Sequence, residues 1–121
     1  MKLLLDTAKV NINLKDSYGQ TALLLAARYG HETVVKLLLD TSKADINIEN
    51  YYGQTPLLWA AENRGKIVVK LLLDTGKANI NIEDYYGQTP LLWAVKNRDE
   101  TVVKLLLDTG KVNINLKNSH G

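Results

Sequence analysis

The chain has 121 residues, no cysteine, and a formal net charge of +2 in which positive and negative side chains are interspersed. The lack of cysteine excludes a disulfide framework and a zinc–thiolate site, and the balanced charge gives no electrostatic case for nucleic-acid binding. The apolar runs are too short to span a membrane, and the apolar stretch near the N-terminus is too short for the core of a signal peptide.

A repeat of 34 residues organises the whole sequence. The tetrad Tyr-Gly-Gln-Thr begins at Tyr18, Tyr52 and Tyr86, and the segment Lys-Leu-Leu-Leu-Asp-Thr occurs four times with the same period. The second and third full units are identical at 25 of 34 positions. A fixed period of this size indicates a stack of similar two-helix units rather than an ordinary globular domain.

This register predicts a single array over residues 1–121. Its full units are residues 16–49, 50–83 and 84–117. Residues 1–15 correspond to the second half of a preceding unit, and residues 118–121 to the start of a further, truncated unit. The helices of one unit are too short to persist alone, so we expect apolar burial between neighbouring units.

The middle unit shows the elements expected in each repeat. Thr55 and Pro56 predict a helix start, because the hydroxyl can cap the helix and proline fits its first position. This short apolar helix is expected to end near Asn63. After a turn, residues 66–74 carry apolar side chains at helical spacing and predict a second helix. Gly76 then fits a left-handed helix end.

The link between units is predicted to be a short hairpin-like loop. Residues 79–82 alternate asparagine with isoleucine, which is typical of a short extended segment. Tyr52 and Gly53 supply the turn before the next helix. The predicted fold class is therefore all-α, a solenoid of stacked helix-turn-helix units joined by hairpin-like loops.

These motifs resemble the ankyrin repeat. The family pattern Gly-x-Thr-Pro-Leu-His-x-Ala-Ala is matched by Gly-Gln-Thr-Pro-Leu-Leu-Trp-Ala-Ala at residues 53–61, and Val-Val-x-Leu-Leu-Leu is matched at residues 68–73. Ala-Asp-Ile-Asn at residues 44–47 is similar to the family's Ala-Asp-Val-Asn. The resemblance covers essentially the whole chain, and the units look like those of long ankyrin arrays in filamentous fungal proteins. It implies a non-enzymatic scaffold for a protein partner.

The chain departs from the family pattern at the turn between the two helices. The family's Gly-His pair is kept as Gly30 and His31, but arginine stands in the place of the glycine at Arg64 and Arg98. We expect these arginines to adopt a left-handed backbone conformation, at a cost of about 1 kcal/mol each.

In the ankyrin family, partners contact the hairpin tips and the exposed side of the first helix. Carried over by position, the candidate protein-binding residues are Ser17, Tyr18, Gln20, Arg28, Tyr29, Tyr51, Tyr52, Gln54, Glu62, Asn63, Tyr85, Tyr86, Gln88, Lys96 and Asn97. Tyrosine suits recognition because it offers a large contact area at low entropic cost. The alternative is that the tyrosines pack on neighbouring hairpins as a stacking ladder, since a fixed period also satisfies stack geometry.

Two other repeated sets have alternative interpretations. Trp59 and Trp93 are interpreted as core between units, because Leu25 occupies the same position in the first unit. A binding anchor is the alternative for these tryptophans. A second repeated set is a row of lysines at Lys43, Lys77 and Lys111. These lysines are expected to be solvated at the surface, and the alternative is that they contact an acidic partner.

No catalytic, cofactor or metal motif is found in the sequence. His31 and Glu32 begin like a zinc-protease helix, but the second histidine would fall at Val35. No glycine-rich phosphate loop occurs either. We therefore expect no enzyme activity, no cofactor and no metal site.

The leading hypothesis is a scaffold that binds a protein partner, with neither nucleic acid nor membrane as a target. One alternative is a structural module that self-associates end to end through uncapped terminal repeats, because the leucines at residues 3–5 repeat the interior leucine run. Another is an engineered or recently duplicated repeat protein without a specific partner. The lack of cysteine favours a cytoplasmic location.

Overall fold

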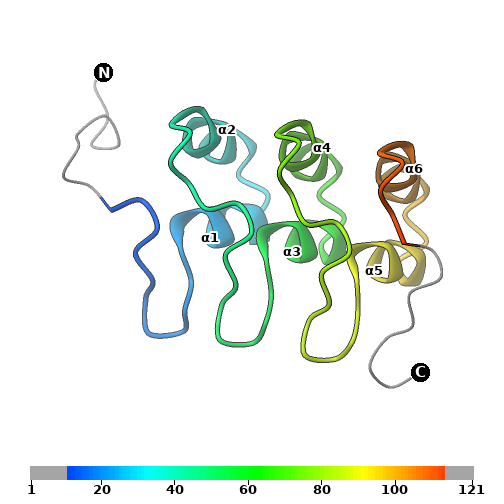
Figure 1. The fold of residues 1–121 in the computed structure, drawn as a ribbon, viewed down its shortest axis with the longest axis horizontal. Coiled ribbons are helices and arrows are strands. Elements are labelled where there is room, and N and C mark those ends of the chain that lie inside the picture. The colour runs from blue at the N-terminus through cyan, green and yellow to red at the C-terminus, as the bar shows by residue number, and fades with distance from the viewer. Residues whose placement is uncertain (1–10, 114–121) are drawn as a thin grey trace.

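The computed structural model describes residues 11–113, and in this part of the chain it contains six α-helices and no strand. The helices come in pairs along the chain: α1 (Ala22–Arg28) with α2 (Glu32–Asp40), α3 (Pro56–Glu62) with α4 (Lys66–Asp74), and α5 (Pro90–Lys96) with α6 (Glu100–Asp108). The first helices form one row and the second helices another (Figure 1). The predicted all-α solenoid is confirmed.

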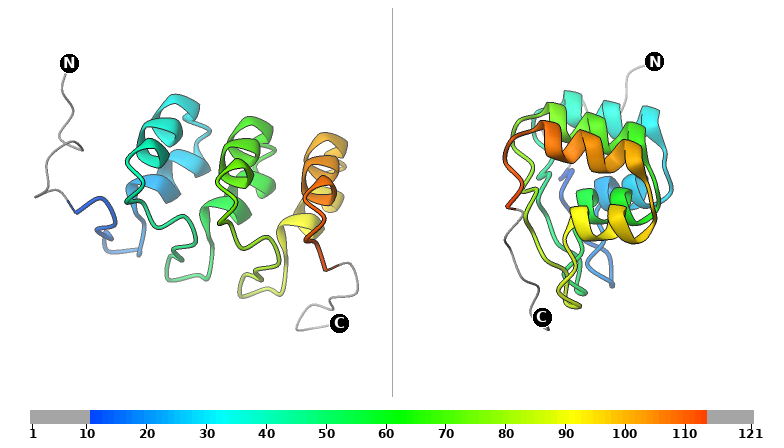
Figure 2. Two further views of the ribbon diagram at one scale, coloured as in Figure 1. Left: turned by 45° about the horizontal axis from the view of Figure 1, so that its top comes forward. Right: turned by 90° about the vertical axis from the view of Figure 1, so that its right-hand side faces the viewer.

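The loops between helix pairs all project from the same side of the two helical layers (Figure 2). They form a third row beside the first helices, so that loop tips of successive units lie next to each other (Figure 1). The partial repeat expected at residues 1–15 lies largely outside the described residues, and the truncated start at 118–121 lies wholly outside them.

Each first helix begins at a threonine, as the Thr-Pro motif predicts. The hydroxyl oxygens of Thr21, Thr55 and Thr89 each accept a hydrogen bond of 3.2 Å from a backbone N–H three residues later. Pro56 and Pro90 occupy the first helical positions, where no N–H is needed. These caps fix where the helix starts, and therefore how the loop enters it.

The two arginines in the inter-helix turn adopt the left-handed conformation expected from the sequence. The φ angles are +61° at Arg64 and +55° at Arg98, close to the +70° of Gly30. Ser42 is a further case, because its φ is +58° where the equivalent Gly76 has +71°. Three non-glycine residues thus hold a backbone conformation that glycine adopts without steric cost.

The prediction of an extended segment at residues 79–82 is wrong. Ile80 and Asn81 form a turn, in which the N–H of Asn81 donates to Oδ1 of Asn79 at 3.2 Å. The asparagine side chain offers the backbone a local partner, and this competes with strand pairing. The alternation of polar and apolar residues instead places Ile80 in the core and keeps the asparagines outside.

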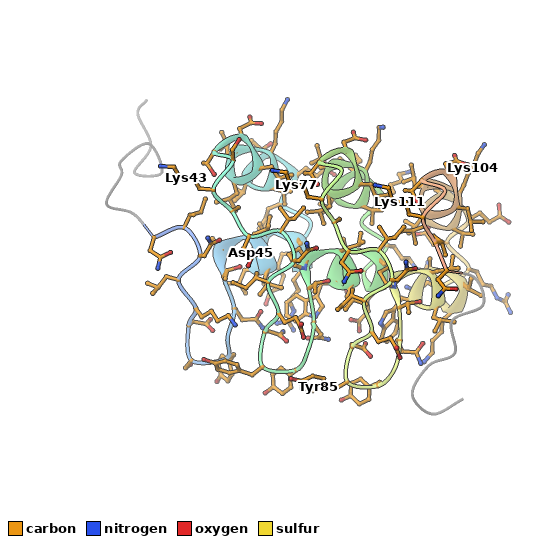
Figure 3. All side chains as sticks on the ribbon, in the orientation of Figure 1. Lys43, Asp45, Lys77, Tyr85, Lys104 and Lys111 are labelled. Carbon is orange, nitrogen blue, oxygen red and sulfur yellow. The ribbon has the colours of Figure 1, made fainter. Side chains whose placement is uncertain are left out.

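A ladder of asparagines joins these turns between units. Asn47 donates through Nδ2 to the carbonyl of Lys77 at 2.9 Å and accepts through Oδ1 from the N–H of Asn79 at 2.8 Å. Asn13 and Asn81 make the same pair of bonds to the loop that follows each of them. The lysine row lies along this ladder, with Lys43, Lys77 and Lys111 exposed side by side (Figure 3).

The apolar core is continuous between successive helix pairs. It combines small residues of the first helices, such as Ala27 and Ala61, with branched residues of the second helices, such as Val69 and Leu72. Small side chains let neighbouring first helices approach closely, and each helix pair needs its neighbours to cover it. Trp59 is also buried, with only 5% of its surface exposed, and Trp93 is partly buried against this core.

Candidate functional site

Each loop tip is closed by a polar residue that accepts backbone hydrogen bonds. Oδ1 of Asp16 accepts from the N–H of Tyr18 at 2.8 Å and from the N–H of Gln20 at 2.9 Å. The N–H of Asp16 donates in turn to the carbonyl of Gln20 at 2.9 Å. Asn50 and Asp84 close the next two tips with the same bonds. The tips therefore hold their shape without a bound partner.

The first tyrosine of each Tyr-Tyr pair packs on the preceding tip. The N–H of Tyr51 donates to the carbonyl of Tyr18 at 3.3 Å, and its ring lies against Gly19. Tyr85 lies in the same way against Gly53, at the end of its loop (Figure 3). For Tyr51 and Tyr85, the stacking-ladder interpretation describes the geometry.

The second tyrosine of each pair faces a different environment. Tyr52 and Tyr86, with Tyr18 from the first tip, line a groove of about 610 Å³ between the loops and the first helices. The groove is lined by Asp16, Tyr18, Gln20, Leu25, Arg28, Tyr29, Tyr52, Gln54, Trp59, Glu62, Asn63 and Tyr86. It thus brings together most of the candidate residues of the first two full units. The candidates outside its lining are Ser17, Tyr51, Tyr85, Gln88, Lys96 and Asn97.

Two cations beside the groove are held on aromatic rings. The guanidinium carbon of Arg28 lies 4.5 Å from the centre of the Trp59 ring and 5.2 Å from the centre of the Tyr29 ring. Nζ of Lys96 lies 5.2 Å from the centre of the Trp93 ring. These cation–π contacts position the charges over the first helices.

The carboxylate of Glu62 lies in the same groove. Its pKa is raised above the ordinary value of 4.5, chiefly because burial removes water from the charged form and secondarily because Asp84 is nearby. Arg28 and Lys96 act in the opposite direction. Within the described residues, Glu62 makes no ion pair at 4.0 Å or less. It is therefore a partly dehydrated carboxylate that has no direct counter-ion among residues 11–113.

Asn63 and Asn97 also serve the stack. Nδ2 of Asn63 donates to the carbonyl of Arg28 at 3.2 Å, and Nδ2 of Asn97 donates to the carbonyl of Glu62 at 2.8 Å. Each asparagine thus satisfies a free carbonyl at the end of the preceding first helix. This contact accounts for their periodic occurrence, and a part in binding stays a prediction.

Three residues of the groove lie outside the candidate set predicted from the sequence: Asp16, Leu25 and Trp59, for which a binding anchor was only the alternative interpretation. Asp16 could have been found from its spacing, because aspartate three residues before Gly19 is typical of a turn whose side chain accepts backbone bonds. Trp59 was interpreted as core, and it is indeed buried, but it also contributes to the lining of the groove.

The family model for ankyrin repeats in three copies matches residues 1–50 and 42–118. The chain belongs to the ankyrin repeat family. Ankyrin repeats are generally protein–protein interaction modules, and the family is typically non-enzymatic. No protein with a curated description matches this ankyrin chain.

Residues 11–113 hold no group of three or more histidine, cysteine, aspartate or glutamate side chains that could bind a metal ion. None of the helices described over this range has the length and apolar character needed to cross a membrane.

Proposed function

We propose that this ankyrin array is a non-enzymatic scaffold that binds a protein partner along the groove. The units at residues 16–49, 50–83 and 84–117 would each contribute a loop tip and a first helix to the contact. The observation that carries the proposal is that Tyr18, Tyr52 and Tyr86, from three successive tips, line one groove together with residues of the first helices. The absence of cysteine from the chain supports a cytoplasmic location.

The place of this row in the groove and the closed loop tips favour recognition. Tyr52 exposes 55% of its surface and Tyr51 exposes 58%, so it is the lining of the groove, rather than exposure, that distinguishes Tyr52. Large exposed aromatic side chains on a fixed backbone lose little conformational entropy when a partner binds. An interface built on them gains contact area from the tyrosine rings and hydrogen bonds from the hydroxyl groups.

Peptides selected from a random phage-displayed library on the wild-type protein would test the proposal. Selected peptides should fail to bind the triple variant Tyr18→Ala, Tyr52→Ala, Tyr86→Ala, which removes the row. They should bind the matched control Lys36→Ala, Lys70→Ala, Lys104→Ala, which changes exposed positions of the second helices. Equal binding to both variants would contradict the groove as the contact surface.

A second candidate function is end-to-end association of copies. Val34 is 44% exposed although the equivalent Val68 is 1% exposed, and Val95 is 57% exposed although the equivalent Ala61 is fully buried. These positions lie on opposite ends of the described stack, and we infer that the apolar surface at one end of a copy could pack on the other end of the next. The leucines at residues 3–5, which also motivated this hypothesis, lie outside the described residues.

Light scattering across protein concentrations separates this candidate from a monomeric scaffold. End-to-end association predicts a mass that rises with concentration, and Val95→Lys with Leu107→Lys should restore the monomer mass, since both residues lie on the exposed end. A wild-type mass that stays constant, or an association that survives both lysines, would exclude it.

A further inference from the structure

The spacing of the tyrosine row restricts the shape of a bound chain. Successive units repeat at about 8–10 Å, the distance between packed helices, so Tyr18, Tyr52 and Tyr86 recur at that interval along the groove. A polyproline II helix advances about 9.3 Å in its turn of three residues. A β-strand presents the same face about every 6.7 Å and would lose register after one unit.

One turn of polyproline II for each unit matches the interval of the tyrosine row, and this match favours that form for a chain bound along the groove.

The hydrogen-bonding groups of the groove suit a chain rich in proline. Nδ2 of Asn50 donates to Oε1 of Gln54 at 3.0 Å and lies 3.5 Å from Oε1 of Gln20. Both glutamines therefore turn their oxygens toward Asn50, and their NH₂ groups make no hydrogen bond within residues 11–113. These donors match a polyproline II segment, which has free carbonyl groups and, at each proline, no N–H that needs an acceptor.

The charges of the groove add a preference for one basic side chain. Glu62 has no ion pair among the described residues, while Arg28, the one cation in the groove lining, lies over the ring of Trp59. A guanidinium or ammonium group from a ligand would supply the counter-ion that Glu62 lacks and would restore hydrogen bonds to its oxygens.

We propose that the groove binds an extended proline-rich segment in polyproline II form, with prolines on Tyr18, Tyr52 and Tyr86 and a basic residue at Glu62. This inference rests on the proposed function, since it names the partner chemistry of the same groove. Aromatic-lined grooves recognise such segments because the ligand is already ordered before binding.

Fluorescence anisotropy with labelled synthetic peptides tests the inference. The probe is a peptide of about ten residues, all proline except one central arginine, long enough to span the row at about 3.1 Å per residue. A glycine–serine peptide with the same arginine is the control for backbone form, and a proline peptide with central glutamate is the control for charge. The proline–arginine peptide should bind at least about tenfold more tightly than either control.

Protein variants then assign the contacts. Glu62→Gln should abolish the difference between the arginine and glutamate peptides, and the triple tyrosine variant should lose binding of the proline peptide. Equal affinity for the glycine–serine peptide, or binding that survives loss of the three tyrosines, would overturn the inference. If only peptides selected from the random library bind and still require the tyrosines, the polyproline II inference fails while the proposed function stands. If neither kind of peptide requires them, both fail.

Discussion

The ring of Tyr51 covers Gly19 of the preceding loop tip so closely that a Cβ atom on Gly19 would lie 2.8 Å from Cδ1 of the ring. The backbone N–H of Tyr51 donates to the carbonyl of Tyr18 beside this contact. Tyr52, the next residue, instead lines the groove. Two adjacent, chemically identical side chains thus have separate tasks, one in holding the stack together and one in forming the candidate binding surface.

Gly53→Ala should be strongly destabilising. The added Cβ would clash with the Tyr85 ring, and φ at Gly53 is +77°, so we expect a loss of about 2–4 kcal/mol in the free energy of unfolding. Urea denaturation measures this loss. Gly76→Ala is the matched control, because φ there is +71° but no atom lies within 4 Å of the new Cβ, and it should cost about 1 kcal/mol. Equal losses in both variants would show that the ring contact is not tight.

Arg64→Gly should stabilise the protein. The backbone at Arg64 has φ +61°, and glycine removes the steric cost of that conformation. After allowance for the greater freedom of glycine in the unfolded chain, the gain should be about 0.5–1 kcal/mol. Thermal and urea unfolding measure it, and Gly30→Arg at the equivalent position should give a loss of similar size. A destabilised Arg64→Gly variant would mean that the arginine side chain contributes more than its backbone costs.

Asn47→Ala should weaken the coupling between the first and second units. It removes the donor to Lys77 and the acceptor for the N–H of Asn79, and because both bonds are exposed, water can replace the lost partners; we expect a loss of about 1 kcal/mol. Equilibrium unfolding measures the cost. Asn11→Ala is the control, because it removes only a hydrogen bond within one turn and should cost less. A smaller loss for Asn47→Ala than for Asn11→Ala would contradict the inter-unit ladder.

The stability of the protein should depend on pH through Glu62. Its pKa is raised above 4.5 in the folded state, so the folded protein holds a proton at pH values where the unfolded chain has lost it. The free energy of unfolding therefore falls as pH rises from 4.5 through the folded pKa, and stays lower above it. Glu62→Gln should remove this part of the pH dependence. Denaturation series at several pH values, with an NMR titration of the Glu62 carboxyl, would show whether the slope persists in the variant.

The sequence predicts the helices well because their signals are local. Thr55 and Pro56 mark a helix start through their own chemistry, and the left-handed Arg64 follows from its alignment with Gly30. The segment at residues 79–82 was predicted wrongly because alternation of polar and apolar residues does not separate a strand from a turn closed by an asparagine side chain. The capping bond from Asn81 to Asn79 decides that case.

The groove could be predicted only in part. Position within the repeat selects Tyr52, Gln54 and Glu62 as exposed, but it cannot say which tyrosine of a pair lies on the neighbouring tip. That depends on how successive tips pack, which places the ring of Tyr51 against Gly19 and the ring of Tyr85 against Gly53, contacts between different units that the sequence does not specify. The raised pKa of Glu62 likewise results chiefly from burial in the folded protein, and the sequence alone does not show how deeply a side chain is buried.

Tyr51 packs on the preceding loop tip, whereas Tyr52 lines the candidate binding groove. A paired comparison of Tyr51→Ala with Tyr52→Ala tests this difference most directly. Urea unfolding and the affinity for a library-selected peptide are measured on each variant. Tyr51→Ala should lose about 1 kcal/mol of stability and keep its affinity within about twofold, whereas Tyr52→Ala should stay within about 0.5 kcal/mol and lose at least about tenfold in affinity. A Tyr52→Ala variant that loses stability as Tyr51→Ala does, with unchanged affinity, would contradict the account.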